Sequence, residues 1–233
     1  MFSWFKKKKQ PKNKLESEIS HSDDFQSDEE YFLGEFKSST NAIELPIDSV
    51  EFFPKIEVFC QDGMADDDDI FSICSFPRSG VKGEAQEKAH FISSFREYGD
   101  YPSDKWYNEY CTDYLIGFKV KENKIEILCD SQLFGVSESY ERFKDEYRAI
   151  CIKVKADFTT DKLKDENGTI EMRNTIRQLG SLPKWAQSDE TPQIENIQFV
   201  AQLDPYKLGL DEPYLFLFYD EKEKVYYQVE QYT

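Results

Sequence analysis

The sequence contains few histidines and few tryptophans. It has two histidines, His21 and His90, and three tryptophans among 233 residues. Serine and cysteine hydrolases need a histidine within reach of their nucleophile, and neither histidine stands in such a context. The sequence also lacks a Gly-x-Ser-x-Gly elbow and a glycine-rich phosphate loop. We therefore expect no catalytic residue set and no bound cofactor.

Closely spaced cysteines are absent as well. The five cysteines are Cys60, Cys74, Cys111, Cys129 and Cys151, and no two of them form a Cys-x-x-Cys pair. Zinc sites use such close pairs, and small secreted proteins have a much higher density of cysteine. We therefore expect free thiols in a reducing compartment, packed as small apolar side chains, and no metal site.

The chain has no long apolar run and no excess of basic residues. No run approaches the roughly 20 apolar residues that span a bilayer. Asp and Glu number 46 against 29 Lys and Arg, which gives a formal net charge of −17. A protein that wraps nucleic acid needs clustered basic residues, so no nucleic-acid partner is expected. The acidic excess favours a monomer that meets a basic protein partner rapidly.

Residues 1–41 are predicted to form a charged, mostly disordered arm. Every charged residue from Lys6 to Lys14 is basic, and every charged residue from Glu16 to Glu30 is acidic. Such blocks bury too little apolar surface to offset the entropy of the chain. An apolar tip, Met1 to Phe5, precedes the lysines. This is the wrong order for a secretory signal, so the prediction is a cytoplasmic protein. A short tip without a lipid chain is not expected to bind membranes.

Residues 42–233 are predicted to form an α+β domain, largely antiparallel sheet with a few helices. Alternating apolar residues predict strands at 56–60, 70–76, 114–120, 124–129 and 197–203, and a final aromatic hairpin at 214–219 and 225–229. Helical spacing predicts helices at 84–98 and 137–147. The domain is interpreted either as one unit or as two similar lobes, 42–157 and 158–233.

A further strand is predicted at 148–157. Ile150, Ile152 and Val154 alternate strictly there, which is typical of a half-buried strand. Cys151 has the opposite parity, so it would lie on the other face of that strand.

The segment from Leu179 to Pro192 is predicted to be a loop with a defined conformation. Pro183 and Pro192 fix their own φ and restrict the residue before each of them. Gly180 permits a left-handed turn. Trp185 brings a large ring that needs burial and a partner for its N–H group.

This loop supplies the candidate binding residues. Trp185, Gln187 and Gln202 offer one ring and two amides, which suit the wall of a concave pocket. Glu190, or its neighbour Asp189, is the carboxylate that would act as a general base if the pocket were an active site. In the structural alternative, Trp185 is a mostly buried core ring and the two amides satisfy backbone groups of the loop.

The same segment carries a family resemblance. The residues concerned are Pro183, Trp185, Gln187, Glu190 and Pro192 in the loop, Phe199, Gln202 and Leu203 in the next strand, and Tyr214, Leu215, Phe216 and Phe218 in the hairpin. Their order resembles that of the YwqG-like family of bacterial domains of unknown function. This chain has Gly180-Ser181 where the family usually has two glycines, and it lacks the histidine that often stands upstream. The resemblance implies a mixed, largely antiparallel β fold and no established reaction.

The run from Asp66 to Asp69 leaves two interpretations open. Clustered carboxylates attract hard cations such as Ca²⁺, although the spacing does not match an EF-hand. Adjacent aspartates also repel one another, which favours a solvated loop. The run is therefore either a solvated loop or a weak cation site.

The acidic charge and the missing catalytic set together predict a non-catalytic binding protein. An immunity-type protein that binds a basic protein partner through an acidic face has this character. The alternative is an enzyme or small-ligand receptor that uses a pocket near Trp185.

Overall fold

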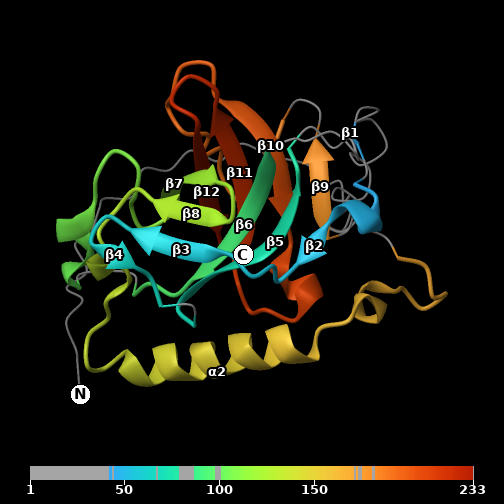
Figure 1. Cartoon of the computed structure of the whole chain (residues 1–233), viewed down its shortest axis with the longest axis horizontal. Helices are drawn as coiled ribbons and strands as arrows, with labels where there is room; N and C mark the ends of the chain where they lie inside the picture. The colour runs from blue at the N-terminus through green and yellow to red at the C-terminus, as the bar shows by residue number, and fades with distance from the viewer. Residues whose placement is uncertain are drawn as a thin grey trace, which may run out of the picture. The chain divides into compact units, whose positions relative to one another are not determined.

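The described part of the chain contains two β-sheets, a 17-residue α-helix and several short 3-10 helices (Figure 1). The computed structural model describes residues 42–43, 45–66, 68–78, 87–97, 101–170, 172, 175–179 and 182–232. These residues belong to one compact unit, Asn41–Thr233. A second unit, Met1–Thr40, lies outside the described residues, and so does the predicted arm. The predicted α+β class with mostly antiparallel sheet is confirmed.

The larger sheet has nine strands in the order β1-β9-β10-β11-β12-β7-β8-β3-β4. They are β1 (Ala42–Ile43), β3 (Glu57–Cys60), β4 (Gly63–Met64), β7 (Leu115–Lys121), β8 (Lys124–Ile127), β9 (Ile176–Leu179), β10 (Gln198–Leu203), β11 (Tyr214–Asp220) and β12 (Val225–Gln231). Neighbouring strands are antiparallel, except that β3 and β8 are parallel. Strands from both sides of residue 157 share this sheet, because β7 pairs with β12.

The smaller sheet has the order β2-β5-β6, with β2 at Glu51–Phe52, β5 at Ile70–Pro77 and β6 at Lys88–Ser94. Almost every residue of β5 and β6 is buried. Successive side chains of a strand point to opposite faces, so both faces of this sheet are covered. Helix α2 (Glu141–Asp157) runs beneath the strands in the view of Figure 1.

Local sequence explains the two hairpins that the pattern predicted. The strands β7 and β8 pair Lys121 with Lys124 and leave a two-residue turn, in which Glu122 has φ +56°. The strands β11 and β12 are joined by a turn whose backbone N–H groups are bound by the Asp220 carboxylate. The strands predicted at 56–60, 70–76 and 197–203 are also confirmed.

The helix predicted at 84–98 is wrong, because residues 88–94 form β6. Apolar residues in this segment recur at near-helical spacing, which suggested an amphipathic helix. The residues from Ala89 to Ser94 are nevertheless all buried. A strand that is covered on both faces shows no alternation of polar and apolar residues, so its sequence resembles that of a helix.

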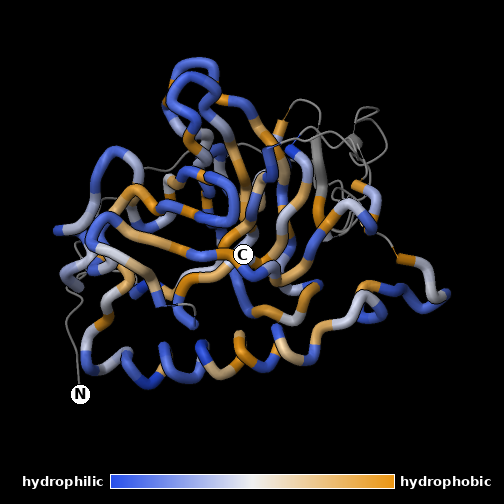
Figure 2. The backbone as a smooth tube through the Cα atoms, in the orientation of Figure 1, coloured by the Kyte–Doolittle hydropathy of each residue, from blue (hydrophilic) through white to orange (hydrophobic). Residues whose placement is uncertain are grey.

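The strand predicted at 148–157 is also wrong, because this segment is the second half of α2. Ile150 and Ile152 are 47 % and 45 % exposed, whereas Cys151 is buried. Tyr147, Cys151 and Val154 lie at helical spacing and pack on the core. Figure 2 shows mainly hydrophilic residues in the first half of α2 and more hydrophobic residues in the second. No helix among the described residues is both long and apolar enough to cross a membrane.

Ion pairs attach α2 to the start of β5. Asp69 is 8 % exposed and lies 2.9 Å from Lys144 Nζ and 2.6 Å from Arg148 Nη2. The interpretation of this acidic run as a solvated loop is therefore wrong at Asp69, which is a structural anchor. In the part of the chain that the structure describes, no group of three His, Cys, Asp or Glu residues is arranged to hold a metal.

All five cysteines are free and buried, as the sequence predicted. Three of them, Cys60, Cys111 and Cys129, come from distant segments and belong to the same core cluster. The influence of the Cys111 and Cys60 thiols, and then burial, raise the pKa of Cys129, so it stays protonated.

His90 lies inside β6 and is 3 % exposed. Its Nδ1 is 3.2 Å from Ser72 Oγ, and its Nε2 has no hydrogen-bond partner among the described residues. Burial lowers the pKa of His90 to about 4, repulsion from Lys88 adds to this effect, and Glu51 opposes it. His90 is therefore a neutral packing residue at physiological pH.

This pKa predicts a specific loss of stability in acid. The unfolded chain binds a proton on His90 more tightly than the folded protein does. The stabilisation of the folded state that is present above pH 6.5 is therefore lost as the pH falls toward 4. Between pH 8 and pH 4, we expect the wild type to lose about 3 kcal/mol more unfolding free energy than His90→Gln. Urea unfolding of both proteins at each pH measures the difference, and equal losses would contradict the assignment.

Candidate functional site

Trp185 packs on the outer face of the carboxyl-terminal hairpin. Its ring centroid lies 4.5 Å from that of Phe216 and 5.8 Å from that of Phe218. These two rings belong to a cluster on one face of β11, while Leu215 and Leu217 face the main core on the other. Trp185 is half-buried. Most of the ring is therefore covered, as predicted, but it packs on the second face of the sheet and not in the main core.

The predicted amides serve the backbone of the loop and of the chain end. Gln202 is buried, and its Oε1 accepts a hydrogen bond from the Lys184 backbone N–H at 3.2 Å. Gln187 is exposed, and its Nε2 donates to the Tyr232 carbonyl oxygen. Both amides therefore satisfy backbone groups, as the structural alternative to a binding pocket predicted.

The two carboxylates of the loop, Asp189 and Glu190, do not form a site with Trp185 and the two amides. Asp189 is exposed, and its Oδ1 accepts hydrogen bonds from the Thr191 backbone N–H and hydroxyl at 2.9 and 2.7 Å. The bonds from Thr191 lower the pKa of Asp189, which suits a loop cap and not a general base. Glu190 is half-buried. Neither carboxylate lines the cavity described below.

Sequence reasoning missed Gln231, which organises the same loop. Its Oε1 accepts hydrogen bonds from the backbone N–H groups of Ala186 and Gln187 at 3.0 and 3.2 Å. Its Nε2 donates to the Ser188 carbonyl oxygen at 2.7 Å. The available sequence signal was a glutamine at the end of an aromatic strand, and the structure shows it 2 % exposed.

A cavity of about 440 Å³ lies between the first turns of α2, the segment after β6 and the segment before β11. Its rim is aromatic. The exposed rings there are Tyr114, Tyr140, Phe143 and Tyr232, which are 39–54 % exposed. Because Gln187 holds the backbone of Tyr232, the predicted loop supports this rim without lining the cavity through its own candidate residues.

Glu212 is the central polar group of this cavity. Its Oε1 accepts hydrogen bonds from both Ser93 Oγ and Tyr147 Oη, and these two hydroxyls also contact each other. Both donors use the same carboxylate oxygen. Within the described ranges, Oε2 receives no hydrogen bond and is left for a group in the cavity.

Burial raises the pKa of Glu212 to about 7. Its two hydrogen bonds and Arg96 act against this rise, while the charge of Glu230 adds to it. On the neighbouring α2, desolvation raises the pKa of Tyr147 and raises that of Cys151 to about 12. Both of these groups stay protonated, so Glu212 is the group that changes charge near neutral pH.

A buried ion pair closes the inner wall. Arg96 Nη2 lies 2.5 Å from Glu230 Oε2, and both side chains are at most 3 % exposed. Arg96 Nη1 also donates to the Thr112 carbonyl oxygen at 2.5 Å. Glu230 neutralises the guanidinium of Arg96. Breaking a buried pair of this kind costs several kcal/mol, so we expect the pair to stay formed. Sequence reasoning missed this pair, although a glutamate in an aromatic strand and an arginine directly after a phenylalanine were visible.

The raised pKa of Glu212 predicts a stability effect opposite to that of His90. The folded state holds this proton more tightly, so stability falls as the pH rises from 4.5 to about 7. Glu212→Gln keeps an Oε1 acceptor for both hydroxyls and cannot ionise. Between pH 4 and pH 8, we expect it to gain about 3 kcal/mol of unfolding free energy relative to the wild type. Urea unfolding at both pH values tests this, and a constant difference would refute it.

Trp185 offers a separate test of its packing. Replacing it with Ala removes its contacts with two rings but leaves the main core intact. We expect a loss of about 2 kcal/mol, smaller than the ~3–5 kcal/mol typical of a fully buried tryptophan. Chemical denaturation measures the loss, with the exposed Gln187→Ala as a control. A loss of the full core size would show that the ring belongs to the main core.

Comparison of the chain with models of protein families, with curated proteins and with solved structures gives no match. Membership of the YwqG-like family therefore stays a prediction. The function has to be argued from geometry, and the described residues offer a carboxyl group that titrates near neutral pH inside an aromatic cavity.

Proposed function

We propose that this protein is a non-catalytic binding module whose Glu212 cavity receives a lysine or arginine side chain of a basic protein partner. The observation that carries the proposal is the placement of the Glu212 carboxyl group, with one unoccupied oxygen, behind a rim of four exposed aromatic rings. Carboxylates and aromatic faces both attract cations.

The charges around the cavity favour a cation. Asp211 and Glu212 line it, and Glu230 lies directly behind its wall. Arg96 is the cation among the lining residues, and its guanidinium is already engaged by Glu230 and by a backbone carbonyl. Above the pKa of Glu212, the three carboxylates outnumber this single guanidinium.

The exposed rim supports a protein partner. Tyrosine and phenylalanine are enriched at the centres of protein interfaces, where they supply most of the binding free energy. A net charge of −17 would steer a basic partner toward the protein from a distance. An immunity-type role, in which the partner is a basic toxin, would use such a surface.

The proposal predicts pH-dependent binding of isolated cationic side chains. A bound cation needs ionised Glu212, so affinity should rise with pH through about 7 and then level off. For N-acetyl-arginine amide and N-acetyl-lysine amide, we expect roughly tenfold weaker binding at pH 6 than at pH 8. No histidine lines the cavity, so this change would report Glu212. Amide NMR shifts of residues at the cavity measure it.

Two variants separate the effect of the Glu212 charge on binding from the effect of the net charge of the protein. Glu212→Gln should weaken binding and remove its pH dependence. Glu195→Gln changes the net charge equally at an exposed site outside the cavity, and it should bind as the wild type does. Equal weakening in both variants, or shifts that map away from the cavity, would reject the proposal.

A further inference from the structure

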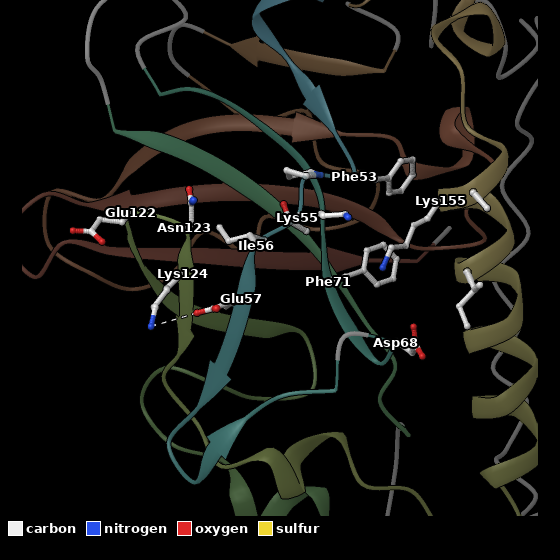
Figure 3. Close-up of a pocket in the computed structure, with 14 residues that line it drawn as sticks. Phe53, Lys55, Ile56, Glu57, Asp68, Phe71, Glu122, Asn123, Lys124 and Lys155 are labelled. Atoms are coloured by element: carbon white, nitrogen blue, oxygen red, sulfur yellow. Dashed lines mark ion pairs between the residues drawn. The ribbon is translucent and has the colours of Figure 1, made fainter.

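A second cavity lies on different elements. It is a groove of about 940 Å³ that opens where β3 and β8 of the larger sheet, β5 of the smaller sheet and the last turns of α2 meet (Figure 3). Its apolar wall includes Phe53, Ile56, Phe71 and Ile152. Ile152 of α2 is 45 % exposed, and its apolar side chain forms part of the wall of this groove.

Two lysines point into the groove from opposite walls. Figure 3 shows Lys55, from the segment before β3, and Lys155, from α2, with their ammonium groups directed toward the space beside the Phe71 ring. The Lys155 ammonium lies 4.5 Å from the centre of that ring. Within the described ranges, no carboxylate lies at ion-pair distance from either ammonium, whereas the third lysine of the groove, Lys124, is paired with Glu57 at 3.3 Å.

The backbone fixes the position of Lys55. Phe53 has φ +48°, a left-handed conformation that is uncommon for an aromatic residue. Its ring packs against those of Phe71 and Phe158, with centroids 6.3 and 5.1 Å apart, and its N–H donates to the Ile73 carbonyl oxygen at 2.8 Å. Pro54 follows and restricts φ. Such strain is retained where the surroundings enforce it, and it clusters at ligand sites.

The remaining charges leave the space between the two lysines cationic. Asp68 and Glu122 also line the groove, but neither is paired with Lys55 or Lys155. Figure 3 shows Glu122 at the end of the groove away from Lys155, and Asp68 on the side of Lys155 with its carboxylate directed away from Lys55. The part between Lys55 and Lys155 therefore combines two ammonium groups with an apolar wall.

We propose that this groove binds a small organic anion. Its carboxylate or phosphate group would lie between Lys55 and Lys155, and its apolar part would lie against Phe53, Ile56 and Ile152. Ammonium groups form strong charge-assisted hydrogen bonds with both kinds of anion. The site is independent of the Glu212 cavity, since it takes a ligand of opposite charge on other residues, and its failure would leave the proposal for Glu212 intact.

The test is a titration of the full chain with two matched pairs of probes, followed by amide NMR shifts. Phenyl phosphate and inorganic phosphate represent one source of the anion, and phenylacetate and acetate represent the other. Within at least one pair, we expect saturable shifts at residues of the groove and tighter binding of the probe that carries the ring. The pair that binds identifies which anionic group the site prefers.

Variants decide whether the lysines carry the binding. Lys55→Ala and Lys155→Ala should each weaken the phenyl probe about tenfold. Lys153→Ala, an exposed residue of α2 that does not line the groove, should bind as the wild type does. Unchanged melting temperatures would show that the variants are folded. Wild-type affinity in both groove variants, an equal loss in Lys153→Ala, or no saturable shift at the groove with any probe would overturn the proposal.

Discussion

The buried amide of Gln228 joins the two sheets. Strand β6 is an edge of the smaller sheet, and Gln228 of β12 accepts from the Ile92 N–H at 3.0 Å and donates to the Ile92 carbonyl at 2.9 Å. The side chain therefore takes the place of a partner strand. Gln228 is fully buried, and leaving these groups of Ile92 unpaired would cost about 1–3 kcal/mol each.

The same amide begins the network that forms the Glu212 cavity. Gln228 Nε2 also donates to Glu230 Oε1 at 3.2 Å, and Glu230 binds Arg96 directly after β6. The residues that lock the sheets together therefore also place a guanidinium and a carboxylate behind the cavity. On the other side, Asp69 ties α2 to β5, which fixes the helix that contributes Tyr147.

Burial shifts the pKa values of His90 and Glu212 in opposite directions. It disfavours the charged form of each, so it lowers the pKa of His90 and raises that of Glu212. Their contributions to stability oppose each other between about pH 4.5 and 6.5, with shifts of similar size. The net change in stability from these two groups across this range is therefore small.

The sequence by itself determined the α+β class, the free buried thiols and the strands whose alternation matches a half-exposed sheet. Near-helical spacing misassigned 84–98, because β6 within it is covered on both faces, and alternation misassigned 148–157, because its isoleucines point outward from a helix. Only the tertiary structure decided the sites. Glu212, Arg96 and Tyr147 are far apart in the chain, and so are Lys55 and Lys155. No local pattern encodes which of these charged residues meet, because pairing of distant strands and packing of α2 bring them together.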